Sequence, residues 1–267
     1  MYDWILGAFL LIWWRDPSLR SVRPGIRNPG RTLTIQDRLA RLDWKAIEAS
    51  LWQRGYAKTD PLLMAEECDA LVALYSKDQL FRSRIDMKHF RFGEGEYKYF
   101  TYPLPLLVQT LREQIYSRLA VIANAWAKTL GQPDHFPLNH DELLAFCRRN
   151  GQTKPTPLLL RYGAGDYNCL HQDIYGAVAF PLQLTAFLSR PDRDFSGGEF
   201  LLVEQRPRTQ SRGEVLTPRQ GELVIFATRH RPMQGSRGYS RVNMRHGVST
   251  VRSGSRFTLG VIFHDAK

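Results

Sequence analysis

The residues of this 267-residue chain that best suit metal chemistry lie in the segment Leu170-His171-Gln172-Asp173. His171 and Asp173 are two positions apart, and on a β-strand that spacing directs both side chains to the same face. An imidazole and a carboxylate on one face can share a metal ion. With a second histidine they would complete a ligand set that leaves three positions of an octahedral ion open, which is typical of non-haem iron(II) oxygenases.

A histidine and an aspartate at this spacing are common, so the residues before them matter. Tyr162-Gly163-Ala164-Gly165-Asp166 leads into the segment that contains His171 and Asp173. This succession resembles the AlkB group of nucleic-acid oxygenases, in which Y-x-x-G-D leads at this spacing into LHQD. The resemblance implies that Tyr162 contacts the co-substrate 2-oxoglutarate. The chain departs from the pattern at Leu160, where the AlkB group has an asparagine that also contacts the co-substrate.

The distal part of the chain resembles a different group, the prolyl 4-hydroxylases. The similarity lies in three segments, Gly197-Gly198-Glu199-Phe200, Pro218-Arg219-Gln220-Gly221-Glu222 and His246-Gly247-Val248-Ser249, and in the arginine Arg256 that follows them. In that group the distal histidine binds the metal, and the basic residue after it binds the tail of 2-oxoglutarate. The resemblance therefore implies that His246 is the third metal ligand and that Arg256 binds the co-substrate.

The two resemblances together cover residues 158–263, and they imply an iron(II)- and 2-oxoglutarate-dependent dioxygenase. The end of the chain is also similar to an uncharacterised bacterial family of this type that has been associated with nucleic acid. The implied catalytic and metal-binding residues are His171, Asp173 and His246. The implied cofactor and co-substrates are Fe(II), 2-oxoglutarate and O2, with hydroxylation of a C–H bond and release of succinate and CO2.

The chemistry of the residues suits these roles. The remote carboxylate of 2-oxoglutarate needs a charged donor, and Arg256 offers a planar guanidinium fork at the start of an apolar run. Arg252 is an alternative for the same role. His230 is an alternative third ligand, but it lies between two arginines whose charges would oppose a metal dication. We expect His135 and His140 to be solvated, and His264-Asp265 to be a surface pair.

The charge of the chain is positive and unevenly spread. The formal net charge is +11. Between Glu222 and Asp265 there is no acidic residue, whereas seven arginines lie there: Arg229, Arg231, Arg237, Arg241, Arg245, Arg252 and Arg256. A concentrated positive field favours anionic partners such as nucleic acid. The basic segment Arg229 to Arg252 therefore predicts a nucleic-acid partner, and an ordinary solvated surface is the alternative.

The sequence leaves three hypotheses about the substrate and the function. The AlkB-like motif and the basic segment favour oxidative demethylation of alkylated nucleic acid, with Tyr167, Tyr175 or Tyr239 available to stack on an extruded base. The distal motif favours a prolyl-4-hydroxylase-like protein or peptide hydroxylase, so a protein substrate stays open. A non-catalytic nucleic-acid-binding module is a further alternative, and the intact set of implied site residues argues against it.

The elements that must position these residues change character along the chain. Helical periodicity dominates from Thr34 to Lys128, and it predicts a long amphipathic helix over Leu104 to Leu130. A short helix is expected over Asp141 to Arg149. A hairpin is expected over Arg84 to Tyr102, with its turn at Gly93-Glu94-Gly95.

After Pro157 the chain consists of short apolar or alternating runs separated by Gly, Pro or Asp. This texture predicts an α+β protein with a double-stranded β-helix, that is a jelly-roll or cupin-like core, and N-terminal supporting helices. We predict three parts: an apolar and Arg-Pro-Gly-rich extension over residues 1–32, a mainly helical support region over 33–150, and the catalytic core over 151–267.

The cysteines and the N-terminal apolar run bear on location. Three cysteines without a CxxC spacing predict neither a disulfide framework nor a zinc site, so a reducing cytoplasm is expected. Trp4 to Trp14 is almost wholly apolar, but it is about half of the ~20 residues that a spanning helix needs. It also lacks the flanks of a secretory signal. We predict no transmembrane span, with a peripheral anchor as the alternative.

Overall fold

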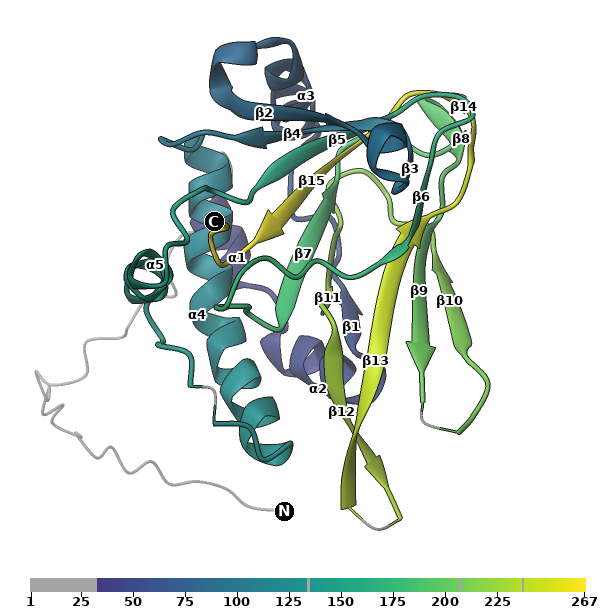
Figure 1. Ribbon diagram of the computed structural model, residues 1–267. Coiled ribbons are helices and arrows are strands. Elements are labelled where there is room, and N and C mark those ends of the chain that lie inside the picture. The colour runs from purple at the N-terminus through teal and green to yellow at the C-terminus, as the bar shows by residue number, and fades with distance from the viewer. Residues whose placement is uncertain (1–32, 134, 207, 237) are drawn as a thin grey trace, which may run out of the picture. The chain divides into compact units, whose positions relative to one another are not determined.

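A computed structural model describes residues 33–133, 135–206, 208–236 and 238–267. The expected extension over residues 1–32 lies outside the described residues. Two antiparallel sheets form the centre of the described part (Figure 1). The larger has seven strands in the order β1 (Tyr56–Lys58), β11 (Leu223–Ala227), β7 (Leu182–Phe187), β15 (Arg256–Ile262), β5 (Leu158–Tyr162), β4 (Glu96–Phe100) and β2 (Phe81–Asp86).

The smaller sheet has six strands. Five follow one another in the order β10 (Arg212–Leu216), β9 (Phe200–Gln205), β13 (Gly238–Val248), β6 (Tyr167–His171) and β3 (Gly93–Glu94), and β12 (His230–Gly235) also pairs with β13. A separate pair is formed by β8 (Phe195–Gly197) and β14 (Val251–Gly254). The connections between the two sheets make the double-stranded β-helix that the sequence predicts.

Helices precede most of the strands in the chain. They are α1 (Ile35–Ala40), α2 (Trp44–Arg54), α3 (Ala65–Ala73), α4 (Leu106–Thr129) and α5 (His140–Arg149), with 3-10 turns η1 (Leu74–Ser76), η2 (Asp78–Leu80) and η3 (Met87–Phe90). Side chains cap the N-termini of three of the α-helices: Thr34 accepts from the amide of Asp37, Asp43 from that of Ala46 and Asn139 from that of Asp141. Each cap satisfies an amide that the helix itself leaves without a partner.

The seven-stranded sheet has two different faces because side chains alternate along each strand. On β15, Leu259 and Val261 belong to the same hydrophobic cluster as Leu111 and Ile115 of α4, the long helix behind this sheet (Figure 1). The alternate residues of β15 face the other way, toward the smaller sheet, where Thr258 lines a cavity. The helices thus support one face of the sheet and leave the other for the site.

The predicted elements compare well with the observed ones, with one difference. The expected long helix is α4, and the expected short helix is α5. The expected hairpin exists as the pair β2 and β4, but its connection is longer than a turn and contains η3 and β3. β3 leaves the larger sheet and pairs with β6 in the smaller one.

The predicted boundary at residue 150 stays a prediction. The segment 33–150 supplies strands to both sheets as well as helices, and residues 33–267 form one compact unit. In the described part of the chain, no helix has the length and apolar character needed to cross a bilayer. The cytoplasmic location also stays a prediction.

Candidate metal centre and co-substrate cavity

The two histidines come together because their strands are neighbours. His171 ends β6, and His246 lies near the end of β13, where the two residues are direct cross-strand partners. Their ring centroids are 4.1 Å apart. The pairing of β13 with β6 is irregular, since Val248 pairs with Asn168, three residues before His171. This irregularity allows Asn168 and His171 both to line the same cavity, although strict alternation would separate them.

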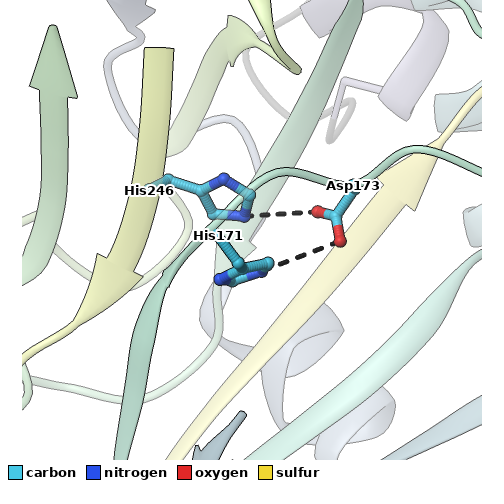
Figure 2. Close-up of side chains that lie close together, drawn as sticks. All are labelled: His171, Asp173 and His246. Carbon is cyan, nitrogen blue, oxygen red and sulfur yellow. Dashed lines mark ion pairs between the residues drawn. The ribbon is translucent and has the colours of Figure 1, made fainter. Parts of the chain in front are cut away.

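Asp173 completes the cluster from an unexpected position. β6 ends at His171, so Asp173 lies in the loop beyond it, and the strand spacing that we used to predict proximity does not apply. The carboxylate nevertheless lies 3.7 Å from Nε2 of His171 and 3.2 Å from Nε2 of His246 (Figure 2). One ligand atom from each residue lies within 4.8 Å of the others. The three side chains converge as a two-histidine, one-carboxylate set.

Hydrogen bonding orients the first histidine. Nδ1 of His171 is 2.8 Å from the carbonyl oxygen of Cys169, which can only accept, so Nδ1 carries the proton. The lone pair of Nε2 then faces the carboxylate of Asp173. Burial and the neighbouring His246 lower the pKa of His171, which keeps its ring neutral. A neutral imidazole with its far nitrogen hydrogen-bonded is the form that binds a metal.

The carboxylate of Asp173 is also held in its binding form. The hydroxyl of Tyr175 donates a 2.7 Å hydrogen bond to Oδ1, and Tyr175 in turn accepts from Tyr99 at 3.2 Å. Burial alone would raise the pKa of Asp173. Hydrogen bonding to and electrostatic interaction with His246, the electrostatic influence of the nearby His171 ring and the bond from Tyr175 together lower that pKa well below its ordinary value. Asp173 is therefore ionised at neutral pH.

A second pair of cross-strand partners lies deeper between the sheets. Arg256 at the start of β15 pairs with Tyr162 at the end of β5. Arg256 is 2% exposed, and its Nε and one terminal nitrogen are buried without a hydrogen-bond partner. Its charge lies over the rings of Tyr162, Phe187 and Phe195, at 5.4, 5.4 and 5.9 Å. Burial lowers the pKa of Arg256 to about 10, so it remains a cation at neutral pH.

Gly198 explains why a glycine pair precedes β9. Its φ of +62° is in the left-handed region, and an added Cβ would lie 2.8 Å from Cδ of Arg256. A side chain at this position would therefore push the buried guanidinium aside. Gly198 thus serves the placement of Arg256, whereas Gly197 lies against the backbone of Thr250.

One cavity of about 320 Å³ contains both groups of residues. Its walls come from both sheets, and they include the three convergent ligands, Tyr162 and Arg256. The volume is in the range of small-molecule sites. An unpaired cation at one end requires an anion, because an uncompensated buried charge is unfavourable. The residues present therefore fit a metal ion together with a small dicarboxylate whose remote carboxylate reaches Arg256.

Residues 95–266 match the model of a family described as "Oxygenase, catalysing oxidative methylation of damaged DNA". The chain belongs to this oxygenase family. Two uncharacterised proteins from strains of Mycobacterium tuberculosis are each 49% identical to it over 167 residues, which is 62% of this chain and 72% of each relative.

Solved structures resemble the oxygenase in fold. A prolyl hydroxylase from Trichoplax adhaerens, in complex with a hypoxia-inducible-factor peptide fragment, is 13% identical, with a TM-score of 0.50, and the match covers 87% of this chain and 92% of that one. An oxidoreductase of the 2OG-Fe(II) oxygenase family from Burkholderia pseudomallei is 15% identical with a TM-score of 0.49, covering 84% and 91%. At this level of identity the likeness shows that the chain shares the fold of these proteins.

The structure does not bring every predicted site residue into the cavity of the oxygenase. The side chain of Arg252 is 74% exposed and lies 3.7 Å from the carboxylate of Glu199, outside the cavity lining. His230 also lies outside it. Of the three tyrosines considered for stacking, only Tyr175 lines the cavity, and its hydroxyl is occupied by Asp173. Tyr239 packs against Trp52 instead.

The basic segment is less uniform than its sequence indicates. Arg231 is 2% exposed and forms a buried ion pair with Glu204, so it adds no charge to the surface. Arg256 is buried in the cavity. Arg229, Arg241 and Arg245 are exposed, and position 237 lies outside the described residues. The predicted cationic face therefore contains fewer than the seven arginines counted in the sequence.

Three polar residues that we expected at the surface are buried. His140 is 4% exposed, and its Nε2 bonds to the carbonyl oxygen of Phe263 at 2.9 Å. His264 and Asp265 are 0% and 2% exposed. Arg112 of α4 pairs with Asp265 at 2.8 Å, and it also donates to two carbonyls of the chain end. Arg112 of α4 and His140 of α5 thus hold the C-terminal end of the chain, and the expectations were wrong because these contacts join segments that are distant in sequence.

Sequence reasoning also missed residues that the cavity uses. Asn168 donates to the hydroxyl of Tyr162 at 3.2 Å, and burial raises the pKa of Tyr162 to about 12, so that hydroxyl stays protonated. Tyr97 and Tyr99 come from β4, far from the motifs. No motif carried these residues. The only signal was the concentration of tyrosine in Glu96–Phe100.

Proposed function

We propose that this oxygenase removes N-alkyl groups oxidatively from nucleic acid. In this proposal His171, Asp173 and His246 hold iron(II), and Arg256 with Tyr162 holds 2-oxoglutarate. The supporting observation is that a buried cation without a carboxylate partner shares one cavity with three convergent metal-ligating side chains. A purely structural site would pair that arginine with an acidic residue.

In this proposal each side chain has a role that depends on its position in the cavity. His171 and His246 present imidazole nitrogens, Asp173 presents an ionised oxygen, and Arg256 neutralises the remote carboxylate of the co-substrate at the deep end. Tyr162 stays protonated and is available as a donor beside that carboxylate. When bound, iron(II) with 2-oxoglutarate and dioxygen supplies the oxidation that replaces a C–H bond by C–OH, releasing succinate and CO2. Apolar walls such as Leu160 and Phe226 keep water from the reacting atoms.

Two observations support nucleic acid as the substrate class. The family description names damaged DNA. Exposed arginines of the basic segment, Arg229, Arg241 and Arg245, provide charge for phosphate contacts. Hydroxylation of an N-methyl carbon would give N–CH2OH, which breaks its C–N bond to release formaldehyde and restore N–H. No further oxidant is needed beyond the co-substrates of the class.

The cofactor assignments are tested by succinate formation from 2-oxoglutarate with added iron(II). We expect His171→Ala to abolish it, and an unaffected variant would refute the metal assignment. The substrate is tested by supplying methylated oligonucleotides and proline-containing peptides to the same enzyme. Formaldehyde from the oligonucleotides supports the proposal. Gain of one oxygen by a peptide, without formaldehyde from any oligonucleotide, would favour the protein-hydroxylase alternative instead.

A further inference from the structure

Large apolar side chains are exposed beside the opening of the cavity. Phe90 is 54% exposed and Phe92 is 45% exposed, and Leu170 and Ile174 are 40% and 41% exposed. Phe92 and Ile174 also line the metal cavity. Scattered exposed apolar residues are ordinary, but a group of them around a cavity marks a binding surface. We name Phe90 and Phe92 the aromatic rim.

The two rings of the aromatic rim are separated by one residue and stack on each other. Arg91, between the two phenylalanines, has a φ of +59°, a left-handed conformation that non-glycine residues seldom adopt. The rings of Phe90 and Phe92 stack with centroids 5.7 Å apart and planes at 17°. Because both side chains are about half exposed, the stacked pair presents a flat aromatic surface to solvent.

The rim is attached to the metal strand. The carbonyl oxygen of Phe92 accepts a 2.7 Å hydrogen bond from the amide of Cys169, two residues before His171. β3, which follows Phe92 directly, pairs with β6. Figure 1 shows β3 beside β6, so the segment that carries the rim and the ligand His171 belong to one edge of the smaller sheet. A molecule lying on the rim therefore has a fixed position relative to the metal site.

The charges around the rim favour an anionic partner. Arg91 is exposed, and among the described residues no carboxylate lies within ion-pairing distance of it. Lys88 is 75% exposed, and its contact with Glu94 at 3.8 Å is solvated and weak. A flat aromatic face beside an unpaired arginine and a weakly paired lysine matches a nucleobase joined to a phosphate. An apolar peptide would use the rings but not the cations.

We propose that the aromatic rim is a stacking platform for an unpaired nucleobase adjacent to the one that enters the cavity, with Arg91 at its phosphate. The inference rests on the proposed function and adds a preference for single strands, because duplex bases have no free face to stack. The rim lies before residue 95, where the match to the oxygenase family begins. It is therefore a feature of this chain that the family match does not supply.

The test compares Phe90→Ala, Phe90→Leu and Phe90→Trp, because Phe90 does not line the cavity. Phe146→Ala is the matched control: Phe146 is 40% exposed on α5, with Arg149 over its ring at 5.6 Å, away from the cavity lining. Binding of a labelled oligothymidylate and of a labelled duplex is measured by fluorescence anisotropy. We expect Phe90→Ala to weaken single-strand binding about tenfold, Phe90→Trp to retain it, and Phe146→Ala to leave it unchanged.

Several outcomes would overturn the platform. Equal single-strand affinity of wild type and Phe90→Ala would refute the stacking platform. Full retention of single-strand affinity by Phe90→Leu would also refute it, since leucine offers apolar contact without stacking. Equal loss on single strand and duplex would remove the single-strand preference. Failure of the proposed function is a separate result, in which the wild-type enzyme releases no formaldehyde from any methylated oligonucleotide. Thermal melting of each variant verifies that it is folded.

Discussion

The buried charge of Arg256 is expected to lower the stability of the ligand-free protein and to bind 2-oxoglutarate. The variant Arg256→Met separates these two effects. The pKa of Arg256 is lowered to about 10 by burial, which corresponds to roughly 3 kcal/mol of cost for keeping the guanidinium charged in the cavity. Its contacts with the rings of Tyr162, Phe187 and Phe195 offset part of this cost, at about 0.5–1 kcal/mol each. Methionine keeps the length and removes the charge. We expect ligand-free Arg256→Met to be more stable than wild type by about 1–2 kcal/mol.

Thermal denaturation with and without 2-oxoglutarate measures both effects. The ligand-free variant should melt about 2–6 °C higher than wild type. Saturating 2-oxoglutarate, at about a hundred times its Kd, should stabilise the wild type by about 2.7 kcal/mol and leave Arg256→Met unchanged. Arg252→Met is the control, because Arg252 is exposed and should keep the full ligand effect. A variant that is less stable without ligand, and that still responds to 2-oxoglutarate, would refute this account of Arg256.

Three further predictions follow from other contacts. Gly198→Ala should raise the KM for 2-oxoglutarate at least tenfold while leaving Mn(II) affinity unchanged by calorimetry, because its Cβ would displace Arg256. Tyr175→Phe should weaken Mn(II) binding about tenfold, since it removes the hydrogen bond to Asp173. Burial lowers the pKa of His140 to about 3, so the unfolded chain binds the extra proton and stability falls as pH drops below about 6.5. In urea titrations between pH 6 and 4, His140→Gln should show a slope shallower by up to about 1.4 kcal/mol per pH unit, and an identical slope would contradict the assignment.

The site was predictable from the sequence where residue type alone carries the chemistry. His171, Asp173, His246 and Arg256 were all proposed from motifs, and all four line one cavity. The geometry behind the proposal was partly different, because Asp173 lies beyond the end of β6. A loop can deliver the same carboxylate as a strand, so a motif can predict a cluster without predicting its backbone.

Burial could not be predicted with the same success. His140, His264 and Asp265 follow or precede turn-like residues, and locally they read as solvated. Their burial depends on segments that meet only in the folded protein: Arg112 of α4 pairs with Asp265, His140 bonds to the carbonyl oxygen of Phe263, and the amide of Phe180 donates to His264. Periodicity predicted that α4 exists. It does not say which distant polar groups the buried positions of the helix will meet.

The substrate is also hard to predict from the motifs, because residues outside them line the cavity. These residues are where substrate selection should be tested. The two cross-strand pairs, His171 with His246 and Arg256 with Tyr162, lie on strands inside the family match, and they are the residues that we propose for the metal and the co-substrate. The aromatic rim reaches the same cavity from a segment before that match, through the unexpected strand β3. An oxygenase can therefore keep one oxidising centre while this edge of the sheet changes. If the rim selects the substrate, replacing residues 88–92 by a segment of the same length without aromatic residues should alter the preference for single strands. The affinity for 2-oxoglutarate should stay the same.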